Sequence, residues 1–194
     1  MPLLIARPIP VRVGLDFTKA LFSPSLQSAH VLVWGLSFGI AYWQSFIGGI
    51  TAYKALPRRD FGKLQSKLFP VYFTLTTGAT AFLAASFAAV HHGRILKANS
   101  LADPTVFQTI LLAGAAVGQA VNTYVLGPKA TQVMFKRHAL EAAEGKDYTD
   151  PTASAQMKNL TKEFGALHGQ STLINMVVVL ALTAQGFWLS NFGL

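Results

Sequence analysis

The chain contains no cysteine among its 194 residues, and charged side chains make up only 12% of them. The lack of cysteine excludes disulfides, thiolate metal sites and a cysteine nucleophile. Soluble domains carry roughly 25% charged residues, so this composition disfavours a water-soluble protein. Catalytic patterns are also missing: the sequence has no glycine-rich phosphate loop, no His-Glu-x-x-His motif and no serine elbow. We therefore do not expect an enzyme.

Four long stretches of the chain have no Asp, Glu, Lys or Arg in their interior. Each has about twenty residues, and at about 1.5 Å per residue that length crosses the roughly 30 Å hydrocarbon core of a bilayer. A water-soluble bundle would need a charged face on each helix, which these stretches lack. We predict an all-α integral membrane bundle of four transmembrane helices, with spans at residues 31–53, 71–90, 105–126 and 170–189.

These four spans are expected to form one transmembrane domain, residues 29–194, which follows a separate N-terminal segment, residues 1–28. The N-terminal segment carries three basic residues and one acidic residue. An interfacial helix that lies along the lipid headgroups and a weak mitochondrial targeting signal both fit this composition. A mitochondrial membrane therefore stays open as the alternative location of the protein.

The basic residues are distributed unevenly between the two sides of the predicted bundle. The loop after the first span and the helical loop at residues 127–169 together hold eleven Lys and Arg residues, whereas the other side holds five. The positive-inside tendency places these two loops in the cytosol and both termini on the opposite side. The net charge of +8 indicates contact with anionic lipid headgroups. Nucleic-acid binding is not expected, because the basic residues flank spans and form no separate domain.

Helix caps and breakers mark the predicted ends of the last two spans. Asp103 can cap the third span, with Pro104 at its first helical position. The Gly-Pro pair at residues 127–128 is expected to interrupt the end of that span. Residues 129–144 form a charged helix candidate, and from Thr152 onward the pattern looks helical into the fourth span. The fourth helix is therefore expected to begin in the cytosol.

Small residues predict where the helices touch, because lipid tails are as apolar as leucine and close approach must drive packing. Gly35 and Gly39 share one face of the first span, and Gly114 and Gly118 share one face of the third. We expect these faces to pack inside one chain, and homodimerisation through one of them is the alternative. Tyr72 and other aromatic residues are expected to be interfacial anchors and packing bulk.

Amide and imidazole side chains gather in the half of the bundle that the charge distribution places toward the cytosol. Uncompensated amides are costly in hydrocarbon, so these groups should turn inward. Two interpretations stay open: a polar pocket that binds a ligand, or a set of interhelical hydrogen bonds, each worth about 1 kcal/mol, with no ligand. The candidate ligand-binding residues, including a basic rim, are Gln44, Arg58, Lys63, Lys67, Gln119, Asn122, His168 and Asn175.

Three histidines are expected at the opposite membrane face. His30 begins the first span, and His91 and His92 end the second. Because histidine is a common metal and haem ligand, these residues form a candidate site for a metal ion or haem. The alternative is that they are ordinary polar residues at the ends of spans. The sequence requires no cofactor.

A run of eighteen residues after the first span resembles the signature of the transmembrane protein 205 family, a group of small four-span eukaryotic membrane proteins. This run, residues 56–73, reads Leu-Pro-Arg-Arg-Asp-Phe-Gly-Lys-Leu-Gln-Ser-Lys-Leu-Phe-Pro-Val-Tyr-Phe. The similarity covers roughly residues 29–190. Weaker matches to the family are His30, Trp34-Gly35, Val121-Asn122, Pro128, His168-Gly169 and Asn175.

The resemblance implies a four-helix fold in secretory-pathway membranes such as the endoplasmic reticulum. It also implies a loose association with tolerance of metals and drugs, without a settled reaction. The chain departs from the vertebrate pattern in its longer N-terminal tail, its lack of cysteine and its loop at residues 144–151. These departures leave the location and the partners open.

Three functional hypotheses follow, and all place the protein in a lipid bilayer. The leading one is a non-enzymatic integral membrane protein that binds or exports a small solute or metal ion through the polar pocket. The second is a structural or accessory subunit of a larger membrane complex, which uses the glycine faces to contact other subunits. The third is a membrane-bound haem or redox enzyme that uses the three histidines.

Overall fold

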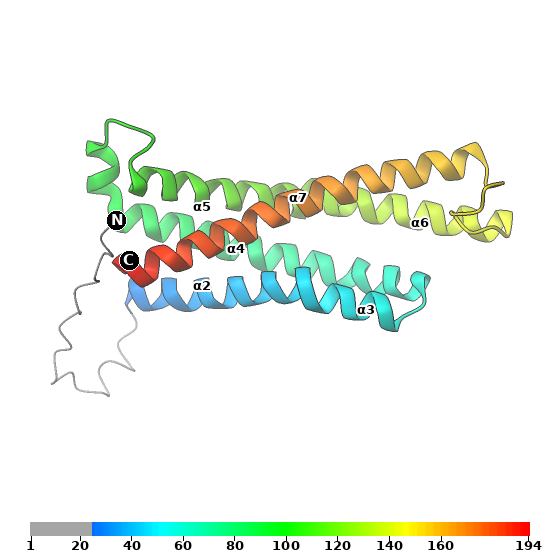
Figure 1. Cartoon of the computed structure of the whole chain (residues 1–194), viewed down its shortest axis with the longest axis horizontal. Coiled ribbons are helices and arrows are strands. Elements are labelled where there is room, and N and C mark those ends of the chain that lie inside the picture. The colour runs from blue at the N-terminus through cyan, green and yellow to red at the C-terminus, as the bar shows by residue number, and fades with distance from the viewer. Residues whose placement is uncertain (1–24) are drawn as a thin grey trace, which may run out of the picture.

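The computed structural model describes residues 25–194. Within this range the chain forms four long helical rods that run up and down beside one another (Figure 1). The first rod comprises α2 (Leu26–Tyr42), the π-helical segment η1 (Trp43–Gly48) and α3 (Gly49–Ala55), and the second is α4 (Arg58–Lys97). The third comprises α5 (Pro104–Val121), the π-helical segment η2 (Asn122–Leu126) and α6 (Gly127–Glu144), and the fourth is α7 (Ala155–Phe192).

All four rods are long and apolar enough to cross a membrane. Rod α2 packs against α4 and α7, and α5 packs against the same two helices, so the rods form a square bundle. The start of α2 and the C-terminus lie at one end (Figure 1), where the Gln27 side-chain amide donates to the Leu194 carbonyl at 3.5 Å. The predicted all-α membrane bundle with an even number of crossings is confirmed.

Short polar side chains start three of these helices. The Ser25 hydroxyl accepts the Ser28 N–H at 3.1 Å at the start of α2, and the Asp103 carboxylate accepts the Thr105 N–H at 2.8 Å at the start of α5. The Ser154 hydroxyl caps α7 in the same way. Each cap satisfies backbone donors that have no partner inside the helix. The predicted cap at Asp103 is therefore confirmed.

Helix α4 begins at Arg58, directly after Pro57, and so extends well before the predicted span at residues 71–90, passing through Pro70 without ending. One predicted break is wrong. The pair Gly127-Pro128 does not interrupt the third rod, because η2 changes the hydrogen-bond register just before it. The Gly127 N–H donates to the Asn122 carbonyl, five residues back, so the helix reaches Pro128 in a spacing that tolerates its missing N–H.

The rods are longer than a bilayer is thick. Helix α7 has 38 residues, which corresponds to about 57 Å, almost twice the hydrocarbon thickness. Figure 1 shows α6 and α7 extending beyond the turn between α3 and α4. The fourth helix therefore begins well outside its apolar stretch, as the sequence predicts from Thr152 onward. The α6–α7 hairpin projects from one end of the bundle.

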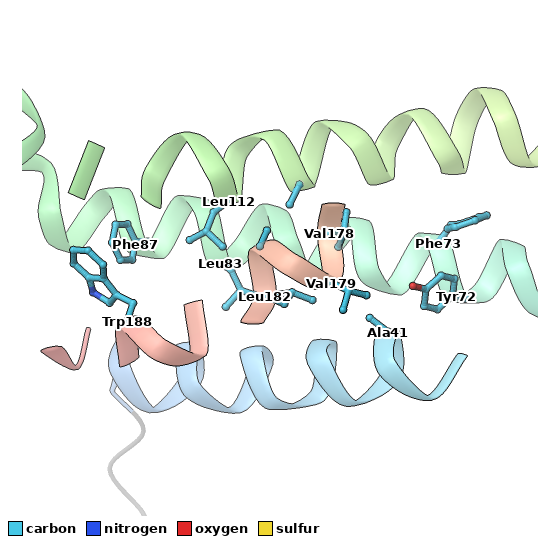
Figure 2. Close-up of a cluster of buried hydrophobic side chains, with 12 residues drawn as sticks. Ala41, Tyr72, Phe73, Leu83, Phe87, Leu112, Val178, Val179, Leu182 and Trp188 are labelled. Carbon is cyan, nitrogen blue, oxygen red and sulfur yellow. The ribbon is translucent and has the colours of Figure 1, made fainter. Parts of the chain in front are cut away.

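A continuous apolar core runs between the rods. Figure 2 shows it extending from Phe87 and Trp188, near the end that holds the termini, to Tyr72 and Phe73. Leu83, on α4, lies between these two ends of the core (Figure 2) and is fully buried. Because the core fills the half of the bundle nearest the termini, it fixes the relative positions of the helices that carry the polar clusters described below.

The predicted glycine contacts divide into two groups. A Cβ atom placed at Gly118 would lie 2.9 Å from Cγ2 of Ile174, so this glycine sits where α5 approaches α7 closely. No atom lies within 4 Å of a Cβ placed at Gly35, Gly39 or Gly114, and all three glycines are exposed on the outside of the bundle. These three glycines therefore do not pack inside the chain, and contact with another chain stays a prediction for them.

Candidate functional site

Six polar side chains from all four rods meet inside the bundle, and we call them the amide cluster. Two of them, Asn122 and Thr76, are almost completely buried, with exposed fractions of 0% and 1%. One member, Tyr72, lies at the opposite end of the apolar core from Trp188 (Figure 2). The members of the cluster are Ser45, Tyr72, Thr76, Gln119, Asn122 and Asn175.

Asn175 on α7 is the centre of the amide cluster. Its side-chain oxygen accepts the Tyr72 hydroxyl at 2.5 Å and the Gln119 amide at 3.3 Å. Its side-chain nitrogen donates to the Ser45 hydroxyl at 2.7 Å. One amide thus joins all four rods, since Ser45, Tyr72 and Gln119 belong to the other three. Such a network fixes the helices in register only while every member is partnered.

Asn122 closes the other side of the cluster. Its amide nitrogen donates to the Gln119 side-chain oxygen at 3.2 Å and to the Ser171 backbone carbonyl at 3.3 Å. Its side-chain oxygen is buried and has no hydrogen-bond partner. Buried polar atoms almost always have a partner, so each exception calls for an explanation. The amide cluster therefore holds one unused acceptor.

Both π-helical segments lie at the amide cluster. Ser45 belongs to η1 in the first rod, and Asn122 is the first residue of η2 in the third. In each segment a backbone N–H donates to the carbonyl five residues back, from Gly49 to Gln44 and from Gly127 to Asn122. Single π turns inside α-helices occur frequently at functional sites. Because both π-helical segments lie at the amide cluster, the backbone at this level of the bundle differs from the regular α-helix of the other levels.

A second set of four polar side chains, one from each rod, lies closer to the termini, and we call it the histidine cluster. The Gln108 amide donates to the Gln185 side-chain oxygen at 2.7 Å, and the Gln185 amide lies 2.9 Å from Nε2 of His30. Nδ1 of His30 lies 2.7 Å from the Ser86 hydroxyl, which donates to the Phe82 carbonyl. No buried nitrogen or oxygen of the four side chains lacks a partner.

The direction of these hydrogen bonds determines the state of His30. An amide nitrogen can only donate, so Nε2 of His30 must accept from Gln185, and Nδ1 must carry the proton that is donated to Ser86. Both ring nitrogens of this neutral imidazole are therefore engaged. His91 instead lies against the rings of Phe87 and Trp188. The three histidines are not assembled into a ligand set.

Among residues 25–194, no group of three or more His, Asp or Glu side chains is positioned to hold a metal ion. His92 is exposed, and its ring contacts the Ala89 carbonyl at 3.0 Å. A metal or haem site at His30, His91 and His92 would require His30 to give up at least one of its two hydrogen bonds.

A third group of side chains joins the start of α4 to the end of α6, and we call it the ionic cluster. Arg58 binds Glu141 at 2.6 Å and Asp147 at 3.1 Å, and Arg59 lies 3.7 Å from Glu141. The guanidinium of Arg58 also lies 4.5 Å from the ring centroid of Tyr148. This cluster connects the turn after α6 to the second rod.

The turn itself holds a charged carboxylate in place. The backbone N–H of Thr149 donates to Asp147 at 3.0 Å, and the Thr149 hydroxyl donates to the same oxygen at 2.7 Å. These bonds hold the pKa of Asp147 below its ordinary value, because they favour the charged form. Asp147 therefore stays anionic at neutral pH beside Arg58.

Comparison with known proteins identifies the family. A family profile described as "Domain of unknown function (DUF4149)" matches residues 32–139, more than half of the chain. The protein belongs to the DUF4149 family. The match extends from α2 into α6, so it includes Gln119, Asn122 and Arg58, while α7 with Asn175 lies outside it.

Curated relatives agree with this assignment. The chain is similar to "Transmembrane protein 205" of Danio rerio, with 29% identity over 92% of this chain and 95% of the relative. It is also similar to "Xanthocillin biosynthesis cluster protein D" of Aspergillus fumigatus, with 25% identity over 84% of this chain and 87% of the relative. No solved structure matches. The predicted resemblance to the transmembrane protein 205 family is confirmed, and neither of these two names states a catalytic activity.

The structure brings together part of the pocket predicted for this DUF4149 protein. Gln119, Asn122 and Asn175 lie in the amide cluster. Gln44 is half-buried in η1, one residue before Ser45. Three members of the cluster were not among the predicted site residues, namely Ser45, Tyr72 and Thr76. Tyr72 and Thr76 are four residues apart on one face of α4, and this spacing could have indicated that they belong to the site.

The other predicted pocket residues lie elsewhere. His168 is exposed on α7 and stacks on the ring of Phe164 at 5.7 Å, so it does not join Asn122. Lys63 and Lys67 are exposed on the first turns of α4, where Lys63 pairs with Asp60 at 3.2 Å. These lysines do not line the amide cluster. The predicted basic rim is therefore separate from the amides.

Proposed function

We propose that this integral membrane protein of the DUF4149 family binds a small polar solute inside its bundle, at the amide cluster. The observation that carries the proposal is the buried side-chain oxygen of Asn122, which has no partner although the neighbouring amides are satisfied. An unpartnered polar atom is costly away from water. A ligand that donates one hydrogen bond to this oxygen would remove that cost.

The chemistry of the cluster indicates which solute fits. Its side chains are amides and hydroxyls, and none is a carboxylate or an imidazole. Neutral donors and acceptors favour an uncharged solute that carries an N–H or O–H group over a metal ion. The two π-helical segments at the same level supply backbone that can adjust its register around such a solute. The same site would serve the movement of the solute across the membrane.

Native mass spectrometry of the detergent-purified protein tests this proposal. We expect the wild-type protein to carry a bound small molecule that is released on collisional activation, and Asn122→Leu to lose it. Gln108→Leu is the matched control, because it removes a buried amide from the histidine cluster and leaves the amide cluster intact. Equal retention by Asn122→Leu and the wild-type protein, or no bound molecule in any of the three, would contradict the proposal.

A second candidate function is that of an accessory subunit in a larger membrane complex. Gly35 and Gly39 are four residues apart on the exterior of α2, and no atom lies within 4 Å of either Cβ position. This spacing of small residues permits close approach of another transmembrane helix. Replacing Gly39 by Ile should dissolve a complex seen by native electrophoresis, whereas Val117→Ile, on an exposed face of α5, should not. A complex that survives Gly39→Ile argues against this function.

A further inference from the structure

The ionic cluster borders a hollow in the protein surface that is separate from the amide cluster. This hollow, of about 360 Å³, lies between the start of α4, the end of α6 and the turn that follows. Gly145 begins this turn with a φ of +64°, a conformation that favours glycine, and so directs the next two side chains to the hollow. Its charged lining residues are Arg58, Arg59, Glu141, Lys146 and Asp147.

Neither Arg58 nor Glu141 has all its hydrogen-bonding atoms paired in this hollow. Nη2 of Arg58 binds Glu141 and Asp147, but Nη1 is buried and has no partner. Glu141 is 2% exposed, and its second carboxylate oxygen is buried without a hydrogen-bond donor. Nε of Arg59 lies 3.7 Å from that oxygen. A buried charge needs hydrogen bonds to all its polar atoms, and here one donor group of Arg58 and one acceptor of Glu141 lack them.

The balance of charge determines what the ligand must carry. The lining contains three cations and two carboxylates, and the two carboxylates are already paired with Arg58. Arg59 also lies 3.7 Å from Glu141, so the lining as a whole keeps one positive charge in excess, and this excess favours an anionic group such as phosphate. The free oxygen of Glu141 requires an N–H donor instead. A ligand that satisfies both needs an anion and an ammonium group close together.

We propose that the hollow binds a phosphate group joined to a primary ammonium, as in phosphoethanolamine. The phosphate would contact Arg59 and Lys146, and the ammonium would donate to the buried oxygen of Glu141. Two sources carry this chemistry: the headgroup of phosphatidylethanolamine and free phosphoethanolamine. The hollow begins directly after the apolar first rod, which ends at Ala55, and it is lined mostly by charged side chains, so a lipid headgroup and a soluble molecule both match its position.

Titration of the full chain in detergent with soluble ligands tests the recognition. We expect phosphoethanolamine to bind about tenfold more tightly than phosphocholine, because the quaternary ammonium of phosphocholine has no N–H to donate. Arg59→Gln, at a half-exposed position, should weaken binding of phosphoethanolamine about tenfold without altering the melting temperature of the free protein. Lys63→Gln is the matched control, because Lys63 is an exposed cation on the next turn outside the hollow.

A second experiment, with lipids, identifies whether the bound group comes from a lipid headgroup or from a soluble molecule. The protein in mixed micelles with phosphatidylethanolamine or phosphatidylcholine is examined by native mass spectrometry, with Arg59→Gln beside it. Selective retention of phosphatidylethanolamine that is lost in Arg59→Gln supports the lipid headgroup. Binding of free phosphoethanolamine without lipid retention supports the soluble molecule. Equal affinity for the phosphoethanolamine and phosphocholine groups in both arms, or no effect of Arg59→Gln, overturns the proposal, and neither result bears on the amide cluster.

Discussion

The histidine cluster and the amide cluster both place polar side chains inside an apolar bundle, but they differ in how completely those side chains are hydrogen-bonded. Each takes a polar side chain from every rod and buries it between helices that are otherwise apolar. In the histidine cluster the bonds form a single chain from Gln108 to the Phe82 carbonyl, and every buried polar atom is partnered. In the amide cluster the bonds branch at Asn175, and the Asn122 oxygen is left over.

The backbone follows the same division. The helices that carry the histidine cluster are regular α-helix at that level, whereas two of the rods at the amide cluster change to π-helix. A fully paired network in regular helices holds the bundle together and offers nothing to a ligand. An incompletely paired network in adjustable backbone sacrifices stability at one level of the bundle. The comparison supports a structural role for the histidine cluster, and the amide cluster stays the site that we propose for the solute.

The largest expected effect comes from adding bulk where α5 and α7 already approach closely, beside the amide cluster. Gly118→Ile should destabilise the protein by about 3 kcal/mol, because even a Cβ atom at this position meets Ile174 at 2.9 Å. The measurement is thermal unfolding in detergent. Gly114→Ile is the matched control one turn away, where no atom lies within 4 Å. Equal melting temperatures for the two variants would show that α5 and α7 are not closely packed here.

The next effect tests the structural role of the histidine cluster. Gln185→Leu should cost about 2 kcal/mol, because it leaves the Gln108 amide and Nε2 of His30 without partners in the apolar interior. Adding Gln108→Leu should restore part of that loss, since one of the two orphaned groups is then removed. If the Gln185→Leu variant had the same melting temperature as the wild-type protein, the histidine cluster would contribute nothing to stability.

Much of the fold could be predicted because membrane insertion leaves a simple pattern. The four uncharged stretches lie within the four rods, and the Asp103 cap lies where its spacing places it. The early start of α4 could not be predicted in this way, because its first turns contain Lys63 and Lys67 and lie outside the apolar stretch. Hydropathy reports where a helix meets lipid, and it does not report where the helix begins.

The candidate site was predicted where local spacing decides the geometry. Gln119 and Asn122, three residues apart, share a face and meet as expected. Tyr72 was assigned to the membrane interface, because tyrosine is common there, and its role appears only when α7 brings Asn175 against it. Glu141 gave no signal, since the burial of a charged residue depends on a partner 83 residues away in the sequence. Such pairings are properties of the tertiary structure.

The smallest expected effect gives the sharpest test of the comparison. Asn122→Leu should lower the free energy of unfolding by about 1 kcal/mol, less than Gln185→Leu does, because the cost of leaving Oε1 of Gln119 without a donor is partly offset by removal of the unpartnered Asn122 oxygen. Chemical denaturation of this variant beside Gln185→Leu measures the difference. A loss as large as that of Gln185→Leu would make both clusters equally structural, because a residue kept for binding a ligand should contribute little to the stability of the free bundle.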